Sequence, residues 1–162
     1  MSFRYHKAAP EDIGLLTETR VTVLRAANKL PEDTDMSAVE RESRNYYEKA
    51  LADGSHTAYL VFDGDRVIGT GGISYYSVMP TFHNVSGMKS YVMNMYTDPE
   101  YRRKGIAIET LRLLVEDSLS RGVTDIGLEA TDMGRPFYER FGFIGAGAEM
   151  ILPEEYTEGN RQ

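Results

Sequence analysis

Residues 89–130 restrict the possible folds more than any other part of this sequence. Residues 89–97 have the composition of a strand, and the strand ends at Asp98-Pro99 because proline is poorly tolerated inside a β-ladder. Residues 104–121 carry apolar side chains at helical spacing, and residues 125–130 predict another short strand. A helix that joins two strands in this way forms a crossover between parallel strands. The sequence therefore predicts an α/β fold with at least one strand–helix–strand crossover.

The remaining segments predict a mixed central sheet with flanking helices. Asp63-Gly64 is a hairpin turn signal between two strand-like runs, which adds antiparallel pairing to the parallel crossover. The predicted element order is β-α-α-β-β-β-α-β-α-β in one domain, residues 1–162, with a loose tail at 157–162. The other predicted elements are a strand at 3–7, a helix from Pro10, a helix from a Ser37/Glu40 capping box, strands at 56–62 and 66–76, a short helix at 136–140 and a final strand or strands within 143–152.

Composition excludes several classes of function. The chain has 18 Lys and Arg against 25 Asp and Glu, a formal net charge of −7, which argues against a general nucleic-acid binder. It has no cysteine, so disulfides, thiol nucleophiles and Cys-ligated metal centres are ruled out. The 3 histidines are dispersed without metal-ligand spacing. No apolar run approaches the roughly 18 residues of a membrane span, and no signal peptide is visible. We expect a soluble cytoplasmic protein with no metal and no membrane partner.

The chemistry is concentrated where the strand at 93–97 passes into the long helix. Arg102, Arg103 and Lys104 precede Gly105, which lets the backbone approach a ligand closely. The first N–H groups of a helix have no internal partner, and the helix dipole adds positive potential there. The segment therefore predicts a phosphate site, although it is neither a Walker loop nor a dinucleotide fingerprint. A solvated basic helix start without a ligand is the alternative.

A family resemblance decides between these readings. Arg102-x-x-Gly105-x-Ala107 resembles the Arg/Gln-x-x-Gly-x-Gly/Ala turn of the GNAT acyltransferases. The strand end Thr97–Tyr101 and the later element Phe137–Phe143 resemble the family's strand before the turn and its Tyr-x-x-x-Gly-Phe element. Together with the hairpin signal, these features cover about residues 56–145 in the family's order. The resemblance implies a GNAT-like mixed sheet and an N-acetyltransferase that uses acetyl-CoA as cosubstrate.

The resemblance also implies where acetyl-CoA binds. The backbone amides of residues 103–108 would hold the diphosphate, and the edge of Met95–Thr97 would pair with the pantetheine arm where the sheet opens at a bulge. The Met95 N–H would stabilise the oxyanion of the tetrahedral intermediate. Thr131 stands where many relatives carry an Asn that contacts the arm. The residues assigned to the cosubstrate are Met95, Tyr96, Thr97, Arg102, Arg103, Lys104, Gly105, Ile106, Ala107, Ile108 and Thr131.

Tyr138 is the general acid that the resemblance implies, protonating the thiolate of CoA as it leaves. Packing that fixes the turn before Gly142 is the other reading of this tyrosine. Some relatives place a base, a Glu, on the strand before the turn, but residues 91–95 hold no carboxylate. We therefore expect a water chain, organised by Asn94 or by backbone carbonyls, to deprotonate the amine. Asn94 is equally compatible with a structural role at a bulge, and Asp132 with capping the short helix.

The acceptor is the least determined part of the prediction. Three acids in the loop at 32–35 would attract a cationic amine, or would form a solvated loop in which Asp35 caps the next helix. A small-molecule primary amine is favoured over a protein amine, because nothing resembles a peptide-docking module. A non-catalytic acyl-CoA-binding domain, a structural partner subunit and a homodimer are the other possibilities retained. The aromatic candidates for the acceptor side are Tyr75, Tyr76, Phe82 and His83.

Overall fold

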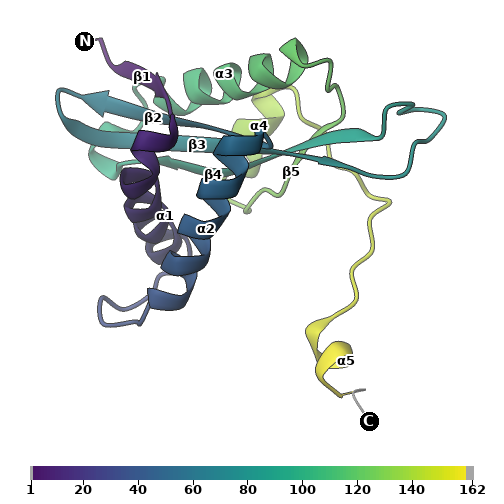
Figure 1. The fold of residues 1–162 in the computed structure, drawn as a ribbon, viewed down its shortest axis with the longest axis horizontal. Coiled ribbons are helices and arrows are strands. Elements are labelled where there is room, and N and C mark those ends of the chain that lie inside the picture. Colours follow the sequence, from purple (N-terminus) through teal and green to yellow (C-terminus); the bar gives the residue numbers. More distant parts are fainter. Residues whose placement is uncertain (1, 160–162) are drawn as a thin grey trace. The chain divides into compact units, whose positions relative to one another are not determined.

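The computed structural model describes residues 2–159, and the chain divides into two compact units, residues 1–129 and 130–162 (Figure 1). The second unit contains two short helices, α4 (Arg135–Phe141) and α5 (Glu154–Gly159). The first unit contains, in chain order, β1 (Arg4–Lys7), a 3-10 turn (Pro10–Asp12), α1 (Ile13–Ala27), α2 (Ser37–Asp53), β2 (His56–Asp63), β3 (Arg66–Ser77), β4 (Met88–Thr97), a 3-10 turn (Pro99–Tyr101), α3 (Ile106–Ser120) and β5 (Ile126–Leu128).

The first unit is built on a 5-stranded sheet with the order β1-β2-β3-β4-β5. Strands β1 to β4 pair antiparallel, and β2 and β3 form the hairpin that Asp63-Gly64 predicts. Strand β5 pairs parallel with β4, and α3 is the crossover between them. The mixed sheet and the crossover predicted from residues 89–130 are therefore confirmed.

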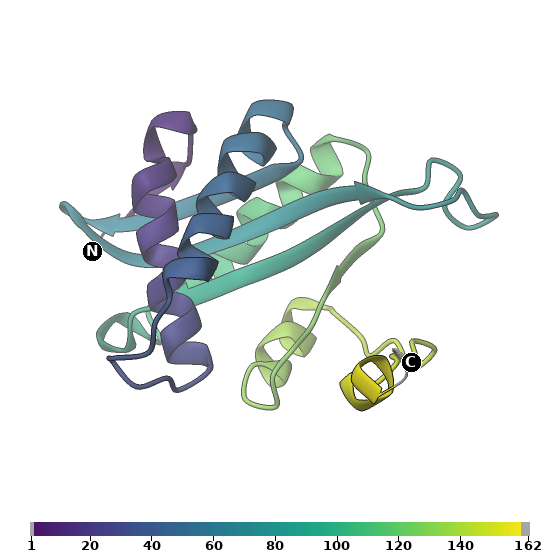
Figure 2. The same ribbon diagram turned by 60° about the horizontal axis from the view of Figure 1, so that its bottom comes forward.

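Both faces of this sheet are covered. Figures 1 and 2 show α1 and α2 on one face and α3 on the other. Leu60 of β2 packs with Leu16 of α1 and Tyr47 of α2, whereas its neighbour Val61 packs with Ile106 of α3. Successive side chains of a strand point to opposite faces, so one strand supplies both cores. This explains why β2 is apolar almost throughout instead of alternating with polar residues.

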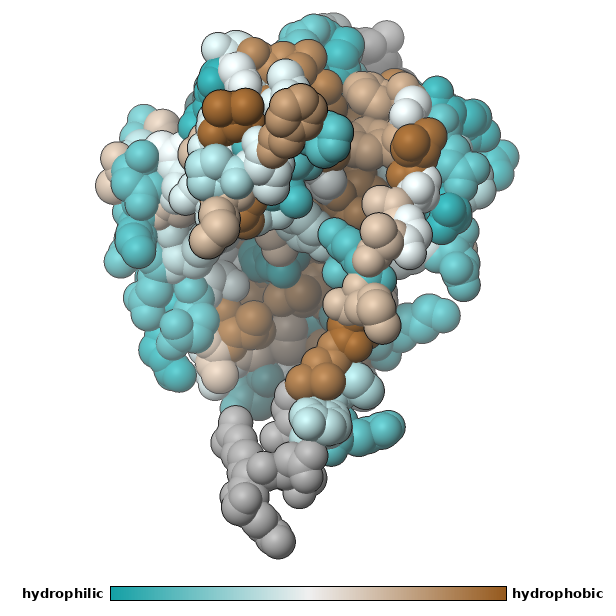
Figure 3. Space-filling model, turned by 90° about the vertical axis from the view of Figure 1, so that its right-hand side faces the viewer, coloured by the Kyte–Doolittle hydropathy of each residue, from teal (hydrophilic) through white to brown (hydrophobic). Residues whose placement is uncertain are grey.

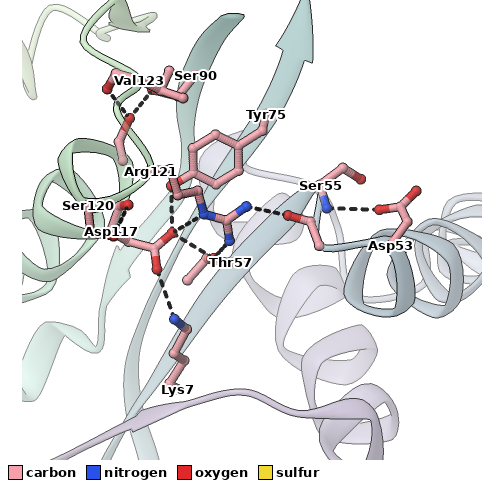
Figure 4. Close-up of polar contacts among 12 residues, drawn as sticks. Lys7, Asp53, Ser55, Thr57, Tyr75, Ser90, Asp117, Ser120, Arg121 and Val123 are labelled. Carbon is pink, nitrogen blue, oxygen red and sulfur yellow. Dashed lines mark hydrogen bonds and ion pairs between the residues drawn. The ribbon is translucent and has the colours of Figure 1, made fainter.

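A polar network fixes α3 to the sheet (Figure 4). The Asp117 side chain on α3 is only 8% exposed, and its carboxylate is fully engaged. Lys7 Nζ donates to Oδ1 at 2.8 Å, and the hydroxyls of Thr57 and Tyr75 donate to Oδ2 at 2.9 and 2.5 Å. Arg121 lies one turn further along, with Nε 3.2 Å from Oδ2. These donors lower the pKa of Asp117 despite its burial, which by itself would raise the value.

The final strand expected within residues 143–152 is not formed, which corrects the predicted order at its last position. After α4, residues 143–153 adopt no regular structure, and most of them are exposed. Gly145 and Gly147 lower the strand propensity of this segment, and the part of the second unit that the structure describes contains no strand to pair with it. The tail expected at 157–162 is helical over residues 157–159, as part of α5, and residues 160–162 lie outside the described part of the chain.

Two predicted helix caps are also corrected. Helix α2 has no Ser37 capping box, because Ser37 already lies inside the helix and its N–H donates to Asp35 Oδ1 at 2.9 Å. Asp132 does not cap α4. Thr131 Oγ1 instead accepts a hydrogen bond from Gly134 N at 3.1 Å, just before the helix begins.

Apolar side chains are exposed at the tip of the β3–β4 hairpin, where Met79, Phe82 and Val85 are 85, 92 and 78% exposed. On the face drawn in Figure 3, brown apolar side chains are interspersed with teal polar ones.

Among the residues that the structure describes, no helix has both the length and the apolar character needed to cross a bilayer.

Candidate functional site

A β-bulge interrupts β4 at Asn94. The register pairs Met93 with Gly72 and Tyr96 with Thr70, so Asn94 and Met95 together lie opposite Gly71 alone. Asn94 takes a left-handed backbone conformation with φ 61°, which asparagine tolerates better than most residues. Gly71 is required here because a Cβ at this position would lie 2.6 Å from Met95 Sδ. The bulge expected from the sequence is therefore present, and Asn94 is its left-handed residue.

Beyond this bulge, strand β5 no longer pairs with the outer edge of β4. Strand β5 pairs only with residues 90–92 of β4, and β5 ends at Leu128. Among the described residues, the edge from Met93 to Thr97 therefore lacks a strand partner on the β5 side. An open edge of this kind can accept an extended ligand as an added strand.

The open edge leads directly into a rigid turn. Asp98 Oδ1 accepts a hydrogen bond from Glu100 N at 2.9 Å, and Arg66 Nη2 bridges Asp98 and Glu100 at 2.8 and 2.9 Å. Tyr101 donates its hydroxyl to Asp63 at 2.8 Å, which joins the turn to the β2–β3 hairpin. Arg66 and Asp63, which precede the turn by about thirty residues, therefore hold it in place.

The basic residues that follow this turn are exposed. Arg103 and Gly105 have left-handed φ values of 62° and 81°, which bends the chain into α3. No side chain of residues 2–159 caps α3, so its first N–H groups are available to a ligand. Lys104 Nζ lies 4.9 Å from the Tyr101 ring centroid, and in the described part of the chain neither Arg102 nor Arg103 has an ion-pair partner. This arrangement suits an anion such as a diphosphate.

A cavity of about 450 Å³ lies on the α1–α2 side of the same sheet. Its walls come from α1, α2 and strands β2, β3 and β4, and Asn94 of the bulge is one of the lining residues. The Tyr46 hydroxyl oxygen lies at hydrogen-bond distance from two groups, 2.7 Å from Ser74 Oγ and 2.9 Å from His56 Nδ1. These three side chains form one hydrogen-bonded group on the wall.

His56 is held as a neutral imidazole in this wall. Its side chain is buried, and burial, followed by the charge of Arg20, lowers its pKa to about 4. A Cβ on Gly72 would lie 2.8 Å from His56 Nε2, so glycine at this position makes room for the ring. Among the described residues, no group of three or more His, Cys, Asp or Glu side chains is arranged to hold a metal ion.

Arg20 of α1 connects the cavity to the bulge. Its Nη1 donates to Asn94 Oδ1 at 2.9 Å, across 74 residues of sequence. Leu16, Arg20 and Val23 follow helical spacing, so Arg20 lies on the same side of α1 as two buried apolar residues. A cation within an apolar stripe is the sequence signal that could have revealed Arg20, which our sequence analysis missed together with Tyr46 and His56.

Tyr138 and Thr131 belong to the second unit. Tyr138 lies on α4, with its ring edge-on to Phe137 and Phe143 at centroid distances of 5.1 and 6.1 Å. Burial raises its pKa, so the phenol keeps its proton at neutral pH. Its hydroxyl has no hydrogen-bond partner within the described residues.

The structure separates the acceptor-side candidates. Tyr75 and Tyr76 line the cavity, and Phe82 and His83 do not. The acidic loop side chains at residues 32, 33 and 35 are exposed, and none of them lines the cavity. The Asp35 carboxylate instead accepts a hydrogen bond from the N–H of Ser37, the first residue of α2. This agrees with the alternative in which the loop is solvated and Asp35 caps the helix.

Comparison with known proteins decides the family. The profile of the acetyltransferase (GNAT) family matches residues 24–143. This chain belongs to the GNAT acetyltransferase family. A crystal structure of a predicted acetyltransferase with acetyl-CoA from Clostridium acetobutylicum is 30% identical, covers 94% of this chain and 96% of its own, and superposes with a TM-score of 0.84. The expected fold and enzyme class, a GNAT-type acyltransferase with an α/β fold, are thereby confirmed.

Curated relatives match over shorter stretches. The uncharacterised N-acetyltransferase YafP of Escherichia coli K12 is 30% identical over 36% of this chain and 36% of its own length. A glucosamine 6-phosphate N-acetyltransferase of Trypanosoma brucei brucei is 27% identical over 54% of this chain and 57% of its own length. The matches thus span less than two thirds of either relative.

Proposed function

We propose that this GNAT enzyme transfers an acetyl group from acetyl-CoA to a primary amine of a small molecule, by direct attack in a ternary complex. The main support is that the Asn94 bulge, the open β4 edge and the exposed basic start of α3 follow one another along one continuous segment. A strand-like arm ending in a diphosphate needs these three features in this order. The absence of cysteine favours direct transfer over a thiol-bound acyl-enzyme.

In this proposal the first unit binds and polarises the thioester. The backbone amides of residues 103–108, including those of Ile106, Ala107 and Ile108, bind the diphosphate, and Arg102, Arg103 and Lys104 add positive charge. The edge at Met95, Tyr96 and Thr97 pairs with the pantetheine arm. The Met95 N–H, next to the bulge, donates to the carbonyl oxygen as negative charge develops on it.

The proton transfers complete the reaction. The amine loses one proton to a water chain that Asn94 helps to organise, and its nitrogen then attacks the carbonyl carbon. As the C–N bond forms and the C–S bond breaks, Tyr138 donates its phenolic proton to the departing sulfur, and the proton that the nitrogen loses on becoming an amide returns through water to the Tyr138 oxygen. The Tyr138 phenol is protonated at neutral pH, as a proton donor must be, although burial raises its pKa and so makes it a weaker acid. Thr131 contacts the CoA arm in this proposal, while its hydroxyl also accepts from Gly134 N.

Acetyl-CoA binding is the first test. Calorimetry should show binding to the wild type, and Gly105→Glu should weaken it strongly. Glutamate adds bulk and negative charge beside the diphosphate, and it also strains a left-handed position. Gly105→Asn is the matched control, because asparagine tolerates this conformation without adding charge. Equal affinity of the wild type and Gly105→Glu would place the diphosphate elsewhere.

Turnover is the second test. Thiol release with a panel of amines should detect activity, and Tyr138→Phe should lower kcat by about 10- to 10⁴-fold with little change in acetyl-CoA affinity. Phe141→Leu is a suitable control on the same helix, since it alters packing without removing a hydroxyl. Binding of acetyl-CoA without thiol release to any amine would instead support a non-catalytic acyl-CoA-binding domain. An unchanged kcat in Tyr138→Phe would remove Tyr138 from its role.

A further inference from the structure

The cavity beside the bulge contains a guanidinium without a counter-ion. Arg20 is half-buried, and its one hydrogen bond in the described structure runs from Nη1 to the neutral amide oxygen of Asn94. No carboxylate within the described residues forms an ion pair with it. An arginine side chain carries five N–H donors, so most of its hydrogen-bonding capacity is directed elsewhere.

The other charged residue of the cavity does not neutralise Arg20. Glu42 of α2 contributes to the lining, but its carboxylate is solvent-exposed and pairs at 3.7 Å with Arg41 Nε. The remaining polar groups of the wall are hydroxyls, an amide and the imidazole of His56, which burial keeps neutral. The charge of Arg20 also contributes to the low pKa of His56, so its field extends through this wall.

A partly desolvated guanidinium favours a ligand that brings an anion. Its planar fork of donors matches a carboxylate, which it can bind through two parallel hydrogen bonds. Arg20 is bonded directly to the bulge residue, so the anion would lie close to the place where the proposed reaction occurs. An acceptor bound in this way must carry its negative charge only a few bonds from the reacting nitrogen.

We infer that the acceptor is an α-amino acid whose carboxylate binds Arg20 and whose α-amine receives the acetyl group. This inference rests on the proposed function and specifies its substrate class. An α-amino acid has one carbon between amine and carboxylate, which suits the direct contact between Arg20 and Asn94. The volume of about 450 Å³ is within the range for small-molecule sites and leaves room for a side chain. Tyr46, Tyr75 and Tyr76 offer aromatic surface to that side chain.

The test compares free amino acids with their carboxamides as acceptors, using thiol release from acetyl-CoA. The ratio of kcat/KM for the free acid to kcat/KM for its carboxamide should be about 10- to 100-fold higher in the wild type than in Arg20→Gln, the usual size of a charge-assisted hydrogen bond. The lower ratio in Arg20→Gln should come mainly from a higher KM for the acid. The amine pKa differs between acid and amide, but this difference is the same for every variant and cancels when the ratios are compared.

Two further variants separate charge from structure. Arg20→Lys keeps the charge without the fork and should retain part of the preference. Arg25→Gln changes an arginine of the same helix that binds the carbonyls of Pro31 and Thr34 outside the cavity, and it should keep the wild-type ratio. If Arg20→Gln does not fold, thermal shift of the wild type decides instead. Free amino acids should raise its melting temperature more than their amides do.

The outcomes distinguish this inference from the proposed function. Acetyl-CoA binding and thiol release with amino-sugar phosphates but not with free amino acids would overturn the inference and leave the proposed function standing. A wild-type ratio that persists in Arg20→Gln would also overturn it. Failure of the wild type to bind acetyl-CoA in calorimetry would reject the proposed function, and with it the substrate class that rests on it.

Discussion

Two charged side chains of the first unit, Asp117 and Arg20, have opposite surroundings. Asp117 accepts hydrogen bonds from Lys7, Thr57 and Tyr75 and lies beside a second cation. Arg20 lines a cavity, and its one hydrogen-bond partner among the described residues is the neutral Asn94. A buried charge that the fold itself satisfies contributes to structure, whereas a charge that the fold leaves unsatisfied can bind a ligand. We expect mutations at the two positions to act on different properties.

The largest effect should follow from Asp117→Ala. This change leaves Lys7 and Arg121 without their carboxylate, and loss of one partner from a buried ionic group costs about 3–5 kcal/mol of unfolding free energy. Urea denaturation measures this value. Glu116→Ala is the matched control, because Glu116 is the exposed neighbour on α3 and pairs only with Arg112, so its loss should cost about 1 kcal/mol or less. Equal losses in both variants would show that the network is not stabilising.

The neutral imidazole of the cavity wall predicts a stability loss in acid. The folded pKa of His56 is about 4, below its ordinary value of 6.5, so the unfolded chain binds the proton first. The stabilisation is complete above pH 6.5 and is lost as the pH falls towards 4. At about 1.4 kcal/mol per pH unit, the protein should be about 2 kcal/mol less stable at pH 5 than at pH 7.

Denaturation curves at these two pH values measure the His56 contribution. The variant His56→Gln cannot titrate, so it should show a much smaller difference between pH 5 and pH 7. The same slope in the variant and the wild type would assign the acid sensitivity to other groups. Asp12 and Asp117 titrate at lower pH, because hydrogen bonds and nearby cations lower their pKa values despite partial burial.

A substitution at Gly72 tests the packing of His56 in the cavity wall. Gly72→Ala places a Cβ 2.8 Å from His56 Nε2, and relieving this overlap should cost about 1–3 kcal/mol of unfolding free energy. Gly127→Ala in β5 is the control, because its Cβ would have no neighbour within 4 Å and should leave stability nearly unchanged. A stable Gly72→Ala protein would mean that the His56 ring can move without consequence.

The smallest effect on stability should come from Arg20→Gln. It removes one hydrogen bond to Asn94 and a charge that the fold does not compensate, so we expect a loss of about 1 kcal/mol or less. The same urea titrations measure it beside Asp117→Ala. If Arg20→Gln destabilises the protein as much as Asp117→Ala does, the contrast between the two positions is wrong, and Arg20 is part of the framework.

Local sequence signals predicted most of the first unit. Asp63-Gly64, Asp98-Pro99 and the apolar stripe of α3 each act over a few residues, and the structure places the corresponding turn, strand end and helix within one or two residues of the prediction. The segment at 143–152 was predicted wrongly, because a strand needs a partner and the local sequence does not specify one.

The acceptor-side cavity could not be predicted in the same way. Its walls join α1, α2 and strands from different parts of the chain, and no short pattern connects Arg20 with Asn94. The diphosphate corner is the opposite case, because residues 97–108 form it within one continuous segment. The sequence therefore predicted the proposed cosubstrate segment and two tyrosines that line the cavity, Tyr75 and Tyr76, but not Arg20.

The long separation between Arg20 and Asn94 has a consequence for assembly of the nascent polypeptide. Synthesis proceeds from the N-terminus, so every wall of the cavity, from residue 20 to residue 94, is synthesised before the corner at residues 98–108. Helices α1 and α2 emerge first, and their apolar faces stay uncovered until β2, which packs against both, has followed them. The residues that line the cavity therefore leave the ribosome before those of the proposed diphosphate site.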